Sequence, residues 1–302
     1  CKPMDAPPIT TVWVVRFTVQ VDWEEDRDFY REIRFLFAAE EGADVPCHLL
    51  IPQRGEGPHP VVICLQGHTS GMHISFGSPK YPGDEDSIAG GRDFALQAVK
   101  QGYAALALEQ RCFGERRDQR KGATKQFSCH HGSLTALLLG RTMVGERVWD
   151  VSRAIDALAE FPQVDRERIG CMGNSGGGTI TFYAACVDER IKIAMSSCSF
   201  CTYRHGRCAV DHCICGYLPG VLKYFEMGDL AGLIAPRAFI VVAGEKDHLS
   251  PIAGVREAFA AAEALYKAAG AEDKIKLVIG SGGHRFYPQE AWPVFRQLSG
   301  WR

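Results

Sequence analysis

A Gly-x-Ser-x-Gly pattern at residues 173–177 is the part of this 302-residue chain most suited to chemistry. An apolar run precedes it, and a helix-permissive run at residues 179–185 follows it. A sharp strand-to-helix turn between two such runs would expose the Ser175 hydroxyl, and bulky residues would collide at Gly173 and Gly177. Because the chain holds 32 glycines, the pattern by itself can arise by chance. It predicts a nucleophile only if suitable partners follow.

Two partners do follow, each directly after an apolar, β-rich run. Residues 238–244 lead to Asp247, and residues 274–279 lead to His284. An imidazole can accept the proton of an attacking serine, and a carboxylate fixes the tautomer of that imidazole and stabilises its charged form. Taken singly, Asp247 could equally cap a helix and His284 could be an ordinary loop residue. The three together, in this order, favour a Ser175–His284–Asp247 catalytic triad.

A further apolar run, residues 60–65, ends in Gln66-Gly67-His68. We expect the backbone N–H groups of His68 and Gly176 to form an oxyanion hole, which stabilises charge that develops only during the reaction. The imidazole of His68 is expected to brace this loop. Gln66, Asn174 and Arg111 are candidate substrate-binding residues. Arg111 closely follows another predicted strand and so points toward the functional edge of the sheet.

The elements that must position these residues alternate between strands and helices. Three antiparallel strands are predicted first, at residues 11–21, 32–38 and 46–51. Further strands are predicted at 61–65, 103–109, 168–173, 191–196, 239–243 and 275–279, with helices near 93–101, 145–161, 179–186, 254–269 and 289–297. This order predicts an α/β fold with a mostly parallel sheet flanked by helices, whose ligands bind beyond the carboxyl ends of the strands.

One domain over residues 1–302 is the simplest organisation, with an N-terminal β extension at about 10–52. Two longer segments, at about 110–141 and 200–227, are predicted to cover the site. The first is basic and could recognise a substrate carboxylate, although a solvated charged face is the favoured interpretation. The second is rich in cysteine and aromatic residues.

Four of the twelve cysteines have spacings that zinc ligands use: Cys198, Cys201, Cys213 and Cys215. Reduced thiols packed under a loop are favoured over a metal site, and a disulfide is the third alternative. We therefore expect no metal and no cofactor. So many unpaired cysteines favour a reducing, cytoplasmic location.

The composition excludes several classes of partner. A formal net charge of −2 gives no reason to expect nucleic acid. No apolar run reaches the roughly 20 residues of a membrane span, and the polar, proline-rich start does not resemble a signal peptide. Met4 could be the native start, and a processed lipoprotein beginning at Cys1 is the alternative. A small ester is the expected partner; the oligomeric state is not indicated.

Several pieces of the chain together match one known family: Gln66-Gly67-His68, Leu106–Arg111, Phe113–Arg116, Trp149–Ala154, the turn at Gly173–Gly177, Asp247 and His284. From about Phe35 to the C-terminus the chain resembles the acetyl xylan esterase-like branch of the dienelactone hydrolase superfamily, a group with the α/β-hydrolase fold. This resemblance implies a serine esterase that acts without a cofactor, often on acetylated sugars or other small acyl esters. Dienelactone hydrolases proper use cysteine where this chain has Ser175, so lactone chemistry is less supported.

Two alternatives to an esterase remain. Serine peptidases related to prolyl oligopeptidases share the sheet and the triad, but they usually carry a gating domain for which this chain has no room. A binding protein with a hydrolase fold would generally have lost a triad member, and none is missing here.

Overall fold

Nine strands form one sheet in the computed structural model, which describes residues 18–68, 70–120 and 124–301. In chain order they are β1 (Val19–Asp26), β2 (Tyr30–Glu40), β3 (Ala43–Pro52), β4 (His59–Leu65), β5 (Ala104–Leu108), β6 (Val164–Asn174), β7 (Ile191–Ser197), β8 (Ala238–Gly244) and β9 (Ile275–Gly280). Across the sheet their order is β1-β2-β3-β5-β4-β6-β7-β8-β9. The pairs from β1 to β5 are antiparallel and those from β5 to β9 are parallel. The predicted α/β fold with antiparallel N-terminal strands is confirmed.

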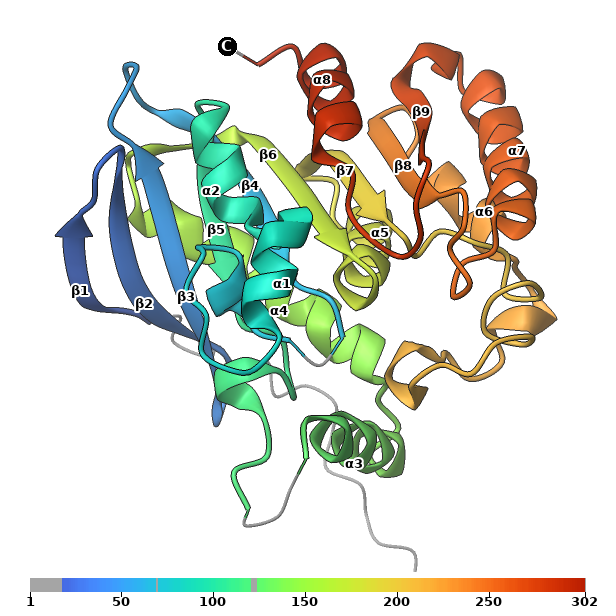
Figure 1. Cartoon of the computed structure of the whole chain (residues 1–302), viewed down its shortest axis with the longest axis horizontal. Coiled ribbons are helices and arrows are strands. Elements are labelled where there is room, and N and C mark those ends of the chain that lie inside the picture. The colour runs from blue at the N-terminus through green and yellow to red at the C-terminus, as the bar shows by residue number, and fades with distance from the viewer. Residues whose placement is uncertain (1–17, 69, 121–123, 302) are drawn as a thin grey trace, which may run out of the picture.

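Helices cover both faces of the sheet (Figure 1). The α-helices of the described residues are α1 (Asp84–Ser87), α2 (Phe94–Lys100), α3 (Lys125–Leu138), α4 (Met143–Ala157), α5 (Gly176–Val187), α6 (Met227–Leu230), α7 (Ile252–Ala268) and α8 (Pro288–Ser299). Because side chains alternate along a strand, Ile63 of β4 lies in the core shared with α4, α5 and α7, whereas Val62 lies in the core shared with α2 and α8. Burial on both faces explains why this strand reads as a continuous apolar run. None of the described helices combines the length and the apolar character needed to cross a membrane.

The parallel strands bring the predicted site residues to one edge of the sheet. His68 follows the carboxyl end of β4, and Ser175 follows β6. Asp247 follows β8 and His284 follows β9. In open parallel sheets this is the edge at which ligands bind.

The short helices α1 and α6 were not predicted, and two further regions differ from the predicted elements. Residues 11–17 of the first predicted strand lie outside the described residues, and β1 extends to Asp26 instead of ending near residue 21. The segment 110–141 contains the helix α3, which begins after Thr124, whose hydroxyl accepts a hydrogen bond from the Phe127 N–H. Ser, His, Cys, Gly and Thr make up much of α3. These are weak helix formers, so the pattern did not predict the helix.

Candidate active site

Ser175 lies at a strained turn between β6 and α5. Its backbone has φ 56° and ψ −120°, a conformation that non-glycine residues rarely adopt. A Cβ on Gly177 would lie 2.1 Å from the Leu65 carbonyl oxygen, and one on Gly173 would lie 2.5 Å from the Gly177 carbonyl carbon. Both glycines are therefore required by close backbone approach, as the sequence pattern predicts.

Asp247 and His284 are joined by a hydrogen bond. His284 Nδ1 lies 2.8 Å from Asp247 Oδ2 and 3.0 Å from Oδ1. Beside a carboxylate, Nδ1 carries the proton and donates it, so Nε2 is the basic nitrogen of the ring. His284 Nε2 is buried and makes no hydrogen bond to the residues that the structure describes.

The Asp247 carboxylate is held ionised. Burial raises its pKa, but the His284 hydrogen bond and charge, together with the N–H groups of Leu249 and Ser250, outweigh burial and lower the pKa overall. The neighbouring Cys198 behaves differently, because burial and the charge of Asp247 raise the pKa of its thiol to about 12. That thiol donates to the Arg285 carbonyl oxygen at 3.2 Å. Asp247 therefore places a permanent negative charge beside the imidazole.

Ser175 and His284 both line a cavity of about 1130 Å³. No hydrogen bond links Ser175 Oγ to His284 Nε2 in the described part of the chain. Such bonds in hydrolytic sites are often long or poorly aligned until substrate binds. The geometry thus brings the candidate nucleophile and base to one cavity, with the base already oriented by Asp247.

The two predicted oxyanion donors lie next to each other. Gly176 is the first residue of α5, so its N–H has no acceptor within the helix. A Cβ on Gly176 would lie 3.2 Å from the His68 backbone nitrogen. Two backbone N–H groups side by side at a helix N-terminus favour negative charge.

The three residues predicted to contact substrate do not line this cavity. The Gln66 amide donates to Ser75 Oγ and to the Arg92 carbonyl, each at 2.7 Å. Asn174 is fully buried, and its Oδ1 accepts from Ser197 Oγ at 2.8 Å. Both side chains brace the loops around the site and lie outside the cavity, so the structure gives no support to substrate contact by either of them.

Arg111 is also turned away from the cavity. Its guanidinium bonds Asp150 through two nitrogens, at 3.0 Å and 2.8 Å, and also bonds Glu40 and Glu146. Asp150 is only 1% exposed, and a buried carboxylate requires a cationic partner. A strand-end position predicts which edge a residue occupies, but not the direction that its long side chain takes.

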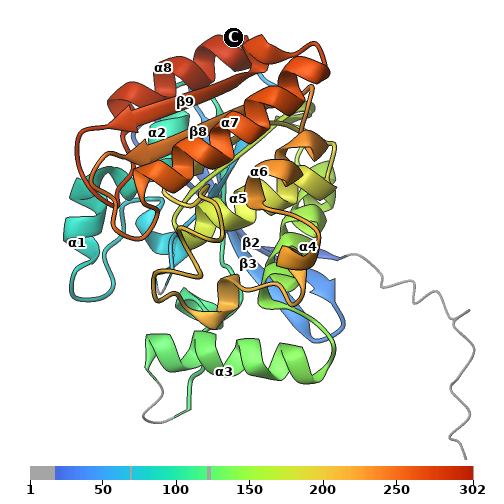
Figure 2. The same cartoon turned by 90° about the vertical axis from the view of Figure 1, so that its right-hand side faces the viewer.

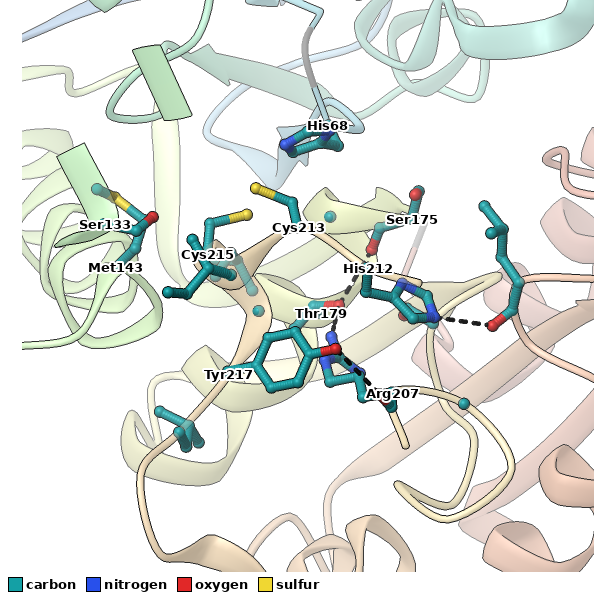
Figure 3. A pocket seen from close by; sticks show the side chains of 18 of the residues that line it. His68, Ser133, Met143, Ser175, Thr179, Arg207, His212, Cys213, Cys215 and Tyr217 are labelled. Atoms are coloured by element: carbon teal, nitrogen blue, oxygen red, sulfur yellow. Dashed lines mark hydrogen bonds between the residues drawn. The ribbon is translucent and has the colours of Figure 1, made fainter. Parts of the chain in front are cut away.

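Sequence reasoning missed several residues of the cavity wall. Arg207, His212 and Tyr217 line it, all from the cysteine-rich segment (Figure 3). Arg207 Nη2 donates to Thr179 Oγ1 at 3.2 Å. The structure describes no carboxylate within ion-pair distance of Arg207, and its Nε is buried without a partner. The only signal in the sequence was the expectation that this segment covers the site.

The four cysteines with zinc-ligand spacing do not come together. Cys198 lies beside Asp247, and Cys201 bonds the Pro251 carbonyl at 3.8 Å. Cys213 and Cys215 lie instead near His68 and Cys129. The disfavoured alternative of a zinc site at these four cysteines is therefore not supported, because a spacing in sequence does not fix which chain segments meet.

The sheet order and the serine at the turn after β6 define an α/β-hydrolase. A model of the acetyl xylan esterase (AXE1) family matches residues 20–229, and the chain belongs to this family. It is accordingly a carboxylic ester hydrolase.

Individual proteins similar to this chain include one hydrolase and several structures with the same fold. YtaP of Bacillus subtilis (strain 168) is 28% identical over 255 residues, which cover 79% of this chain and 77% of that protein. A glucuronoyl esterase from Solibacter usitatus has a similar structure, with a TM-score of 0.72, 16% identity and coverage of 99% of this chain and 88% of that one. Acetyl xylan esterase 1 from Thermoanaerobacterium sp. JW/SL YS485 gives a TM-score of 0.64 at 16% identity, over 94% of this chain and 88% of that one. At these identities the two structural likenesses support the fold alone.

Proposed function

We propose that this protein is a serine esterase that removes small acyl groups, acetyl above all, from carbohydrate esters through an acyl-enzyme. The observation that carries the proposal is the Asp247–His284 hydrogen bond of 2.8 Å, which leaves His284 Nε2 as the free base beside the cavity that Ser175 also lines.

The mechanism has two halves. In the first, His284 takes the proton of Ser175 as Oγ attacks the ester carbonyl, and the N–H groups of His68 and Gly176 stabilise the oxyanion. His284 then protonates the leaving alcohol. In the second half, water attacks the acyl-serine with the same base, and the acid is released while the Ser175 hydroxyl reforms.

The substrate class rests on the cavity and on the relatives. A cavity of about 1130 Å³ accommodates more than a lone acetyl ester. Arg207, His212 and Tyr217 offer polar groups along its wall, which suits a hydroxyl-rich alcohol portion. The family carries the name of acetyl xylan esterase, and similar structures include acetyl xylan and glucuronoyl esterases.

Replacing the nucleophile tests the proposal. Ser175→Ala should fold normally and lose hydrolysis of p-nitrophenyl acetate by about a thousandfold or more, because triad members act as a unit. It should also lose covalent labelling by a fluorophosphonate, seen by intact mass. Ser87→Ala, on the half-exposed end of α1, is the matched control and should keep both. Turnover near the wild-type rate in Ser175→Ala would remove Ser175 as the nucleophile.

A further inference from the structure

Four side chains with metal-binding atoms meet at one end of the cavity. One donor atom from each of His68, Cys129, Cys213 and Cys215 lies within 4.8 Å of the other three. The sulfurs of Cys129 and Cys213 are 3.7 Å apart. In a tetrahedral site with Zn–S bonds of about 2.3 Å, two sulfur ligands are separated by ~3.8 Å. The distance between the Cys129 and Cys213 sulfurs therefore matches the distance expected between two sulfur ligands of one zinc ion.

The donors are sheltered, and one is unsatisfied. Cys129 and Cys215 are buried. His68 Nε2 is buried and has no hydrogen-bond partner among the described residues, which is costly for a polar nitrogen. In Figure 3 the ring of His68 and the sulfurs of Cys213 and Cys215 face the same space. A metal ion there would satisfy the nitrogen and all three sulfurs.

The charge around the cluster fits the same occupant. Arg147 is 2% exposed, and the described residues include no carboxylate within ion-pair distance of it. Its Nη2 donates to Cys129 Sγ at 3.4 Å. A Zn²⁺ ion with three thiolates and a neutral imidazole carries one net negative charge, which would balance Arg147.

The helix that carries Cys129 is held only weakly by the other side chains that the structure describes. α3 lies apart from the helices that cover the sheet (Figure 2). Many of its apolar side chains, and those just after it, face solvent: Phe127, Leu134, Leu137, Leu138 and Leu139. Its buried side chains are small, such as Cys129, Ser133 and Ala136. Little apolar area therefore holds α3, and a bond from Cys129 to a metal would supply the anchor.

We propose that His68, Cys129, Cys213 and Cys215 bind one structural zinc ion. This ion would attach α3 and the cysteine-rich segment 200–227 to the loop after β4. Three sulfurs and one imidazole nitrogen in a tetrahedral arrangement are a ligand set that zinc uses. The imidazole binds neutral, and each thiol that is not yet ionised releases its proton on binding. If the proposed function holds, the same ion also fixes His68, whose N–H receives the oxyanion.

Metal content tests the site without reference to esterase activity, so the outcome is independent of the role of Ser175. Protein expressed with zinc and purified under reductant without chelator should contain about one zinc per chain by inductively coupled plasma mass spectrometry. Cys129→Ser and Cys215→Ser should each lower that content about tenfold or more, since the site loses a ligand. Cys208 is an exposed cysteine in the same segment, 200–227, as Cys215, and Cys208→Ser should retain the metal. Cys201→Ser should also retain it, because Cys201 lies outside the cluster.

Cobalt provides a second measurement that does not depend on variants folding. Wild-type protein stripped of metal and titrated with Co²⁺ should develop a thiolate-to-cobalt charge-transfer band together with the visible bands of tetrahedral cobalt, saturating at about one equivalent. Wild type without zinc and without this band would overturn the proposal. So would full zinc content in both Cys129→Ser and Cys215→Ser, or a Cys129–Cys213 disulfide found by peptide mapping of the protein as purified.

Discussion

Arg111 follows the end of a strand, which suggested a role in substrate binding, but its guanidinium has a structural role. It stands just after β5, yet its side chain bonds Asp150, Glu40 and Glu146. Arg116 is the second partner of Asp150, at 2.6 Å. The pair of arginines neutralises a carboxylate that α4 buries, so their contribution is to stability and not to substrate binding.

Arg111→Met should therefore lower the free energy of unfolding by about 3 kcal/mol, because it leaves a buried carboxylate short of a partner. The KM for p-nitrophenyl acetate should stay within about twofold of wild type, since no contact with substrate is lost. Urea unfolding and steady-state kinetics measure the two quantities. Arg256→Met, on the exposed face of α7, serves as the control. An increase in KM with unchanged stability would restore Arg111 to the substrate site.

At the scale of elements, each predicted site residue is placed by the end of a strand. β4, β6, β8 and β9 are parallel and adjacent or nearly so, so the loops that follow them converge. The turn from β6 to α5 is the tightest of these connections, because the backbone of Gly177 packs directly on the end of β4. Loss of that contact would displace Ser175 and the oxyanion donors together.

Gly177→Ala tests this packing. Its Cβ would lie 2.1 Å from the Leu65 carbonyl oxygen, so β4 or α5 must move. We expect the free energy of unfolding to fall by about 3 kcal/mol or more in urea titrations. Gly90→Ala is the control, because nothing lies within 4 Å of the Cβ it would add. A loss for Gly177→Ala no larger than that of the control would contradict the geometry.

At the scale of the whole molecule, charge makes stability depend on pH in two opposing ways. Several carboxyl groups have a lowered pKa through hydrogen bonds and nearby cations: Glu32, Glu40, Asp84, Glu115, Asp165, Asp188 and Asp247. These ionised carboxylates stabilise the folded state at pH values above their unfolded pKa, and the stabilisation is lost as the pH falls through their folded pKa.

Glu109 has the opposite effect on stability, because burial raises the pKa of its carboxyl group from 4.5 to about 7. Between pH 4.5 and about 7 the folded state keeps a proton on Glu109 that the unfolded chain releases. Glu109 therefore lowers the free energy of unfolding by an amount that grows as the pH rises through this range.

Glu109→Gln removes this pH-dependent destabilisation, because glutamine does not ionise. The difference in free energy of unfolding, variant minus wild type, should be about 3 kcal/mol larger at pH 8 than at pH 4.5. This follows from about 1.4 kcal/mol for each unit by which the pKa is raised. Glu109 Oε1 accepts from the Met72 N–H and Oε2 accepts from the Glu115 N–H. Comparing two pH values cancels any fixed cost of replacing one of these two oxygens. Glu41→Gln, on an exposed turn, is the matched control for urea unfolding at both pH values. An equal gap at the two pH values would mean that Glu109 is not protonated in the folded state.

The sequence by itself determined the elements and the order of the candidate triad. Apolar periodicity and turn glycines act over a few residues, so β4, β6, β8 and β9 and the turn at Ser175 could be predicted. The helix α3 could not, because weak helix formers make up much of it and its position depends on contacts with distant segments.

Tertiary structure alone decided which side chains meet. It turned Arg111 toward Asp150, enclosed Gln66 and Asn174, and placed Arg207 on the cavity wall. It also brought the sulfurs of Cys129 and Cys213 to 3.7 Å from each other, although the two residues are 84 positions apart in sequence. Cys198 and Cys201 lie outside this cluster. The physical reason is that spacing along a chain fixes local geometry, whereas contacts between remote segments follow from how helices and loops pack on the sheet.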